Sequence, residues 1–232
     1  MTRVLGIETS GTIGSVALWE GRLVVEESFQ RGLVHGKALV PTIARLLEQA
    51  GWEKSTLGLI AVSQGPGSYT GVRVGVATAK ALAYALGCPI VGVPTLDAMA
   101  RNCPSAEVHV APVVDARWEQ VYTALYGPGG DRVSGPRAVR PEELARELPE
   151  RVRLFGDGIK RYRALFERTG VTFGGEEEWT CHARVVAEFG ARAFAEGRRD
   201  DPLTLVPLYL RPTEAEAKLA PRSLGVGGAG IA

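Results

Sequence analysis

The sequence predicts an α/β protein made of two similar lobes, each with a mixed sheet flanked by helices. Three observations lead to this prediction. The chain opens with a strand–turn–strand pattern, it continues with a helix and a strand–glycine turn–helix unit, and residues 108–126 repeat the opening pattern. The length of 232 residues fits one large domain or two small lobes.

The first half of the chain alternates strand and helix signals. Apolar runs separated by Gly, Ser and Thr predict an antiparallel meander over 4–7, 13–19 and 22–29. The elements expected next are a helix over 35–50, a buried strand over 57–62, a helix over 72–86, a strand over 90–93 and a short helix over 95–101. The helix over 72–86 is apolar or small on nearly every face, so it must be covered on all sides.

The second half has weaker signals. Strands are expected over 108–114 and 118–126, and past Pro128 the apolar runs shorten while arginine, glutamate and glycine increase. Helices are expected over 141–148, 160–169 and 183–196. The last ten residues, 223–232, lack bulky side chains to bury, so we expect a flexible tail there.

An internal correspondence supports the two-lobe prediction. Aligning Glu8 with Asp115 places Ala-Leu-Trp at 17–19 on Ala-Leu-Tyr at 124–126. Each half then has an apolar strand, an acid, a turn and a second strand. We therefore expect an N-terminal lobe over 1–107 and a C-terminal lobe over 108–222, each directing a carboxylate into a shared cleft.

Composition excludes several classes of protein. A hydrophobic content of 45% is too high for a disordered chain, and 27 basic against 26 acidic residues give no overall positive field for nucleic acid. Three cysteines without CxxC spacing argue against a disulfide framework and a zinc knuckle, and indicate a reducing compartment. With neither a signal peptide nor a membrane span expected, the prediction is a cytoplasmic protein.

The turn formed by Glu8, Thr9 and Ser10 is the first candidate site. Backbone N–H groups and hydroxyls between two strands could bind a phosphate, and the acid could hold a water or a cation-bound phosphate. A polar hairpin turn that satisfies its own backbone explains the same residues, and such turns are common.

A glycine-rich turn before the helix over 72–86 is the second candidate. Gly65, Gly67 and Ser68 allow close backbone approach and helix capping, and the helix N-terminus suits an anion. The turn lacks the Gly-Lys-Ser/Thr ending of a Walker loop and the spacing of a dinucleotide fingerprint. A tight structural turn explains it equally well.

The two long helices raise a third question. Their apolar excess fits burial inside the chain, and it fits equally well a face that packs on another protein. The three histidines, by contrast, show no metal-ligand spacing.

Five segments carry a family resemblance. They are Ile-Glu-Thr-Ser at 7–10, Ser-Val-Ala-Leu at 15–18, Gln-Gly-Pro-Gly-Ser-Tyr-Thr-Gly-Val-Arg-Val-Gly at 64–75, Gly-Val-Pro-Thr-Leu at 92–96 and Val-Asp-Ala-Arg at 114–117, with a weaker echo at 206–211. Together they resemble the TsaB family, also called YeaZ, whose members are accessory proteins of bacterial tRNA threonylcarbamoyladenosine synthesis. The resemblance implies an actin/Hsp70/sugar-kinase-like fold with duplicated lobes, a fold class abbreviated ASKHA.

The resemblance also implies a division of labour. TsaD, the catalytic relative, transfers threonylcarbamoyl to N6 of the adenosine just 3′ of the anticodon, position 37, and binds metal through two histidines. In this sequence Thr95 and Met99 stand at those histidine positions, so neither a metal site nor a metallopeptidase activity is expected. The implied role is a non-catalytic subunit without catalytic residues, which activates a TsaD-type partner.

The implied partners are a TsaD-type subunit in a heterodimer, a TsaE-type ATPase, and tRNA met through the complex. The resemblance places the dimer surface on the two long helices, and the sequence leaves open whether the chain alone forms a homodimer through them. The residues expected on this surface are Leu39, Ile43, Leu46, Val74, Ala77, Lys80 and Ala81.

No cofactor is expected. The Asp-x-Gly-Thr phosphate turn of nucleotide-binding relatives is here Glu-Thr-Ser-Gly-Thr, and the added bulk argues against ATP in the chain's own cleft. Glu8, Thr9, Ser10, Gly65, Gly67, Ser68 and Asp115 would then be remnants of phosphate-binding turns. The sequence leaves open whether a nucleotide binds at the heterodimer interface. The rival interpretations are an independent ATP-dependent phosphotransferase that uses Glu8 and Asp115, and a scaffold with no role in tRNA modification.

Overall fold

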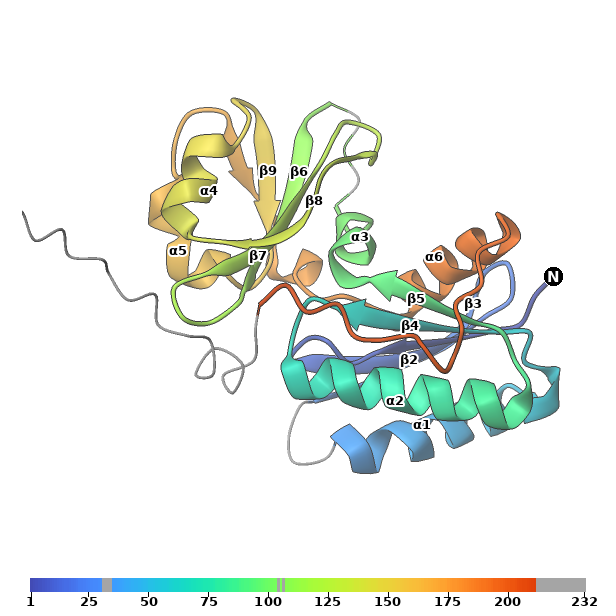
Figure 1. The fold of residues 1–232 in the computed structure, drawn as a ribbon. Helices are drawn as coiled ribbons and strands as arrows, with labels where there is room; N and C mark the ends of the chain where they lie inside the picture. The colour runs from blue at the N-terminus through green and yellow to red at the C-terminus, as the bar shows by residue number, and fades with distance from the viewer. Residues whose placement is uncertain (31–34, 104, 106, 212–232) are drawn as a thin grey trace, which may run out of the picture.

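Two five-stranded mixed sheets form the framework of the protein (Figure 1). The computed structural model describes residues 1–30, 35–103, 105 and 107–211. The predicted flexible tail over 223–232 lies outside the described residues. Within the described part of the chain, no helix is long and apolar enough to cross a membrane.

The first sheet confirms the predicted meander. Its strand order is β3-β2-β1-β4-β5, with β1 antiparallel to β2, β2 antiparallel to β3, and β1, β4 and β5 parallel. The strands are β1 (Val4–Glu8), β2 (Ile13–Trp19), β3 (Leu23–Gln30), β4 (Leu59–Gly65) and β5 (Ile90–Pro94).

The second sheet repeats this topology. Its order is β10-β9-β6-β7-β8, so β6 takes the place of β1, β7 that of β2, β8 that of β3, β9 that of β4 and β10 that of β5. These strands are β6 (His109–Asp115), β7 (Val121–Tyr126), β8 (Arg132–Val139), β9 (Val152–Phe155) and β10 (Val171–Phe173). The repeat confirms the duplicated fold, and it places Glu8 and Asp115 at equivalent strand ends.

Helices cover both sheets. The first sheet is flanked by α1 (His35–Gln49) and α2 (Tyr69–Leu86) on one side and by α6 (Ala183–Ala195) on the other, while α4 (Pro141–Glu147) and α5 (Ile159–Phe166) pack on the second sheet (Figure 1). The short α3 (Thr95–Ala100) lies between the sheets, and single 3-10 turns form η1 (Lys54–Thr56) and η2 (Glu176–Glu178).

Strict alternation along the strands explains why the first sheet has two buried faces. On β1, Leu5 and Ile7 pack against α1 and α2, whereas Val4 points to the opposite side. On β4, Ile60 and Val62 point toward α1 and α2 in the same way. Because successive side chains leave a strand on opposite faces, a continuous apolar run fills both layers.

The predicted boundary between the lobes needs a correction. Helix α6, placed by the sequence in the C-terminal lobe, packs on β1, β2 and β4 of the first sheet. Its side chains Val186 and Ala187 join a core cluster that also contains Val4, Leu59 and Phe155. The first lobe is therefore completed by a helix that follows the second sheet in the chain, which local patterns in the sequence do not show.

Two further details differ from the sequence prediction. Residues 118–120 form a turn rather than the start of a strand, so β7 begins at Val121. The strands β8, β9 and β10 were not predicted. The first of them reads Arg-Val-Ser-Gly-Pro-Arg-Ala-Val and the last spans three residues, so neither carries a clear apolar alternation.

After α6, residues 198–211 form an extended segment that we call the strap. It runs back along α2 toward the second lobe (Figure 1). Asp200 accepts a hydrogen bond from the Gly92 amide at 2.7 Å, and Lys80 Nζ donates to the carbonyl of Leu205 at 2.8 Å. At its end, an Arg211 N–H donates to the carbonyl of Ala116 at 2.6 Å. The strap thus ties the first sheet to the second.

The contact between β1 and α6 generates a stability prediction. A Cβ on Gly6 would lie 2.4 Å from the Ala183 carbonyl oxygen and 2.8 Å from Ala187 Cβ. Gly6→Ala should therefore lower the free energy of unfolding by about 1–3 kcal/mol, as overpacking of a core does. Urea unfolding followed by circular dichroism measures this. Gly135→Ala is the matched control, because nothing lies within 4 Å of a Cβ there, and equal effects at both positions would contradict the packing argument.

Candidate functional site

The two candidate phosphate turns lie against each other. The Ser68 amide donates to the Ser10 carbonyl oxygen at 2.7 Å, and the Thr9 hydroxyl donates to the Gly71 carbonyl oxygen at 2.8 Å. Both Thr9 and Ser10 are buried. The turn after β1 therefore occupies the space in front of the N-terminus of α2.

The glycines at the start of α2 permit this close approach. A Cβ on Gly67 would lie 2.6 Å from the Ser10 carbonyl oxygen, and one on Gly71 would lie 2.0 Å from the Thr9 carbonyl oxygen. On the next helical turn, a Cβ on Gly75 would lie 2.2 Å from Thr9 Oγ1. Since real side chains never approach so closely, three glycines at this spacing are explained by packing between two segments of this chain.

The remaining features of the glycine turn serve the backbone. Gly65 has a φ of +99°, a conformation that other residues rarely adopt. Ser68 is the N-cap of α2, and its Oγ accepts a hydrogen bond from the Gly71 amide at 3.3 Å. Helix α2 therefore begins at Tyr69, three residues earlier than predicted, because its cap lies inside the glycine segment.

Glu8 lies beneath these turns rather than in a cleft. It is fully buried, and its Oε1 accepts hydrogen bonds from the Ser10 amide and from the Ser10 hydroxyl, the latter at 2.6 Å. Burial raises the pKa of Glu8, while the hydrogen bonds from Ser10 oppose the rise. A thiol, that of Cys181, lies beside it, and its pKa is also raised by burial and by the neighbouring Glu8. The expectation that Glu8 points into a shared cleft is wrong, because its side chain is enclosed by protein.

Asp115 has a different environment although it occupies the equivalent strand end. It is half-buried, and its Oδ1 accepts a hydrogen bond from the Arg117 amide at 2.9 Å. Its own amide donates to Asp157 Oδ1 at 2.9 Å. Desolvation and then repulsion from Asp115 raise the pKa of Asp157. The duplicated acids have thus diverged into one enclosed carboxyl and one that closes a local turn.

Three of the seven predicted interface residues are placed in the chain's own core. Leu39, Ile43 and Leu46 are at most 4% exposed and pack against the first sheet. Their prediction as docking residues is wrong, because the apolar stripe of α1 faces the sheet it covers. The outward residues of α1 include Val40 and Ala44.

The residues predicted on α2 divide into two groups. Ala77 and Ala81 are exposed, and Val74 is half-buried. Lys80 is half-buried and bound to the strap through the carbonyls of Leu203 and Leu205. Helix α2 therefore presents small side chains outward, while its one lysine faces the chain itself.

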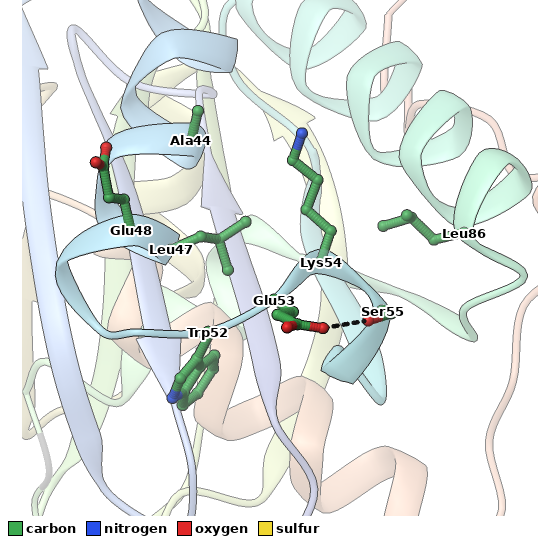
Figure 2. Close-up of a pocket in the computed structure, with 8 residues that line it drawn as sticks. All are labelled: Ala44, Leu47, Glu48, Trp52, Glu53, Lys54, Ser55 and Leu86. Carbon is green, nitrogen blue, oxygen red and sulfur yellow. Dashed lines mark hydrogen bonds between the residues drawn. The ribbon is translucent and has the colours of Figure 1, made fainter.

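A shallow groove lies where α1 and α2 end. Its volume is about 560 Å³, and Leu47 of α1 and Leu86 of α2 line it on either side, with Lys54 between them and Trp52 below Leu47 in the view of Figure 2. It has no contact with the turns around Glu8. Among the described residues, no group of three or more His, Cys, Asp or Glu side chains could hold a metal ion. Thr95 and Met99, the two residues that the family resemblance aligned with metal-binding histidines, are buried.

A cluster of arginines and aromatic rings lies at the junction of the lobes, and no pattern in the sequence predicted it. Arg73 lies 3.9 Å from the ring centroid of Tyr69 and donates to the Tyr209 hydroxyl at 2.6 Å. Arg211 lies 6.0 Å from the ring centroid of Trp118. These residues are far apart in the sequence and the strap joins them, so no local pattern could predict the cluster.

The enclosed carboxyl generates a prediction on pH. In the unfolded chain, Glu8 loses its proton near its ordinary pKa of 4.5. In the folded chain its pKa is raised, so Glu8 keeps its proton to higher pH. The folded state is therefore favoured below pH 4.5 and loses stability as pH rises toward the native pKa, by up to about 1.4 kcal/mol per pH unit. Glu8→Gln removes this dependence, so the stability of the variant relative to the natural protein should increase as pH rises above 4.5.

Urea unfolding of both proteins between pH 5 and 8 measures the difference. The exposed Glu48 provides the control, Glu48→Gln, which should follow the pH dependence of the natural protein. Parallel curves for Glu8→Gln and the natural protein would show that Glu8 is ionised when folded.

Comparison with known proteins assigns the family. Residues 32–196 match the family model described as "TsaD: tRNA N6-adenosine threonylcarbamoyltransferase". The chain is 33% identical over 222 residues to the "tRNA threonylcarbamoyladenosine biosynthesis protein TsaB" of Bacillus subtilis, covering 93% of this chain and 96% of that protein.

Solved structures agree with this family assignment. "YeaZ from Pseudomonas aeruginosa" superposes with a TM-score of 0.80 at 28% identity, covering 90% of this chain and 100% of that one. An inorganic polyphosphate/ATP-glucomannokinase from Arthrobacter superposes with a TM-score of 0.52 at 14% identity over 83% of this chain and 99% of its own, which confirms the sugar-kinase-like fold. Coverage of nearly the whole chain, at this identity and with this fold, shows that the chain belongs to the TsaB family of tRNA threonylcarbamoyladenosine biosynthesis proteins.

Proposed function

We propose that this chain is a non-catalytic accessory subunit that activates a TsaD-type enzyme. The product is the threonylcarbamoyl group on N6 of the tRNA adenosine 3′ to the anticodon, in tRNAs that read codons beginning with adenine. The observation that carries the non-catalytic part is the packing of Thr9 and Ser10 into the glycine turn. A reactive site cannot form where two segments of the chain fill the space between strand end and helix start.

The same packing supports the absence of a nucleotide from the chain's own cleft. A phosphate at the N-terminus of α2 would have to displace the Ser10 carbonyl, which accepts the Ser68 amide at 2.7 Å. An independent phosphotransferase would also need an ionised Glu8 that reaches substrate, and burial opposes both. A nucleotide bound between subunits would need phosphate ligands from the partner.

The outward face of α2 is the surface we assign to the TsaD-type partner. This helix has two charged residues among 18, Arg73 and Lys80, and Lys80 is bound to the strap. The outward face of α2 is therefore an uncharged surface, which lies beside the outward residues of α1. It is formed by Ala77, Ala81 and Tyr84, which is 74% exposed. Uncharged surfaces with an exposed aromatic are typical of interface cores.

Small side chains on α2 also allow a partner helix to approach closely, and the groove that contains Leu86 lies at the C-terminal end of this helix. The chain alone would use this face to form a homodimer. A TsaE-type ATPase is the third component of the proposed complex, which would act on tRNA in the cytoplasm.

Substitution on this face tests the assignment. Ala81→Glu should weaken the complex with a TsaD-type subunit by about 100-fold or more, because an unpaired carboxylate would be buried at the interface. Ala195→Glu makes the same change at an exposed alanine of α6, on the other side of the first sheet, and should leave affinity unchanged. Isothermal titration calorimetry measures both, with circular dichroism as a check on folding. Equal affinities for the two variants would reject this face as the interface.

The proposed activity is tested by reconstitution. Transfer of labelled threonine to tRNA is measured in a mixture of TsaD, TsaE, the adenylate-forming enzyme, bicarbonate and ATP. Incorporation should require this chain, and the chain without TsaD should give none. Glu8→Gln should support full transfer, because a carboxyl enclosed by protein reaches no substrate. Normal incorporation without the chain would refute the accessory role.

A further inference from the structure

A line of arginines and exposed aromatic rings crosses the junction between the two lobes. We call it the aromatic–arginine rim, and its members are Tyr69, Arg73, Arg117, Trp118, Tyr209 and Arg211. Three parts of the chain contribute: the first turn of α2, the end of the strap, and the turn between β6 and β7. In Figure 1 the end of the strap lies between the N-terminus of α2 and the second lobe.

One half of the rim is a guanidinium that packs on one of two neighbouring tyrosine rings and donates a hydrogen bond to the other tyrosine. Arg73 lies 3.9 Å from the centroid of Tyr69 and 5.6 Å from that of Tyr209, and the two ring centroids are 5.3 Å apart. The hydrogen bond from Arg73 Nε to the Tyr209 hydroxyl fixes the arrangement. Both tyrosines remain about two-fifths exposed, at 41% and 42%. Ring surface and a positive charge are thus offered together to solvent.

The other half of the rim is a strained turn that exposes a tryptophan. The backbone has successive φ values of 62°, 53° and 57° at Arg117, Trp118 and Glu119. Residues other than glycine rarely adopt such left-handed values. Trp118 is 69% exposed. The turn is held by Arg211, whose guanidinium donates to the carbonyls of Ala116 and Arg117 at 2.6 and 3.2 Å.

The strained turn and the exposed indole of the second half do not stabilise this chain. Left-handed residues in succession and an exposed indole are both unfavourable, and strained turns of this kind cluster at functional sites. Because the Arg211 guanidinium holds this turn through two backbone carbonyls, the surface that the turn presents needs an explanation. The chemistry offered is ring faces with adjacent guanidinium groups.

We propose that the aromatic–arginine rim binds single-stranded RNA, with bases stacking on the rings and phosphates on the arginines. This rests on the proposed function, because it assigns a direct RNA contact to a subunit of a tRNA-modifying complex. Proteins that bind single strands combine aromatic stacking surfaces with cations that follow the backbone. A duplex would not fit as well, because its bases are already stacked.

Charge favours RNA over a protein as the occupant. The rim has three arginines, Arg73, Arg117 and Arg211, and its turn has one acid, Glu119. The neighbouring Asp115 is half-buried, and its carboxylate accepts a hydrogen bond from the Arg117 amide. Protein interface cores are depleted of charged residues, whereas phosphates require cations. The uncharged face of α2 fits a protein partner better and lies along the helix away from this rim.

Binding of a labelled oligoadenylate of about ten nucleotides to the full chain tests the proposal, by fluorescence anisotropy at low salt. Trp118→Ala should weaken binding about 5- to 100-fold, the range measured for losing one stacked base. Arg73→Gln should weaken it and reduce the salt dependence by about one phosphate contact. Glu119→Gln removes the acid of the turn and should tighten binding.

Matched controls are Phe194→Leu and Arg192→Gln on α6, which change a half-buried ring paired with Arg199 and an exposed arginine away from the rim, and which should leave affinity unchanged. Oligoadenylate should also quench the tryptophan fluorescence of the natural chain, and Trp118→Phe should abolish most of the quenching, which a merely structural role would not do. Equal affinities in rim and control variants would overturn the proposal, as would equal affinity for a duplex of the same length.

A protein occupant is the remaining outcome. If Trp118→Ala leaves RNA affinity unchanged but releases a TsaD-type partner, the rim is a protein contact and the proposal is wrong. The two proposals can fail separately, because threonine transfer that requires the chain would stand even if the rim bound no RNA. Transfer that proceeds without the chain would instead remove the proposed function.

Discussion

The contact between the turn after β1 and the N-terminus of α2 is the constraint on which the structure depends. Ser10 and Thr9 lie so close to the start of α2 that one position before the helix, Gly67, and two within it, Gly71 and Gly75, accept glycine alone. This contact sets the depth at which α2 lies on the first sheet. It also fills the space in front of the N-terminus of α2, so the same packing shapes both this lobe and the turn that the sequence suggested for a phosphate.

The position of α2 in turn determines the route of the strap. Lys80 and Gln64 offer hydrogen-bond partners along the helix and the neighbouring strand, and the strap follows them to Arg211. Because Arg211 holds the turn after β6, the end of the chain links two lobes whose sheets share a topology. The outward side of α2 is left with small, uncharged residues, and its first turn is left with Tyr69 and Arg73. Two surfaces of different chemistry thus lie on one helix.

The two duplicated lobes differ in the environment of the acid at their equivalent strand ends. Glu8 and Asp115 end equivalent strands, yet one carboxyl is enclosed beside Cys181 and the other accepts a backbone hydrogen bond at the surface. A protein that used both acids on one substrate would need both at the cleft. Enclosure of one of them is the physical difference between the two lobes at these equivalent strand ends.

The sequence by itself determined the duplicated α/β architecture, the main helices and the glycine turn, because apolar periodicity and turn residues act locally. It also carried the family, since the motif over 64–75 is specific in residue type and spacing. Tertiary structure alone decided which face of α1 is outward, that α6 completes the first lobe, and that Glu8 is enclosed. These depend on contacts between distant segments, as does the aromatic–arginine rim, whose members are brought together by a strap about 100 residues beyond them in the chain. Local patterns record what a segment prefers, and they do not record which distant segment will cover it.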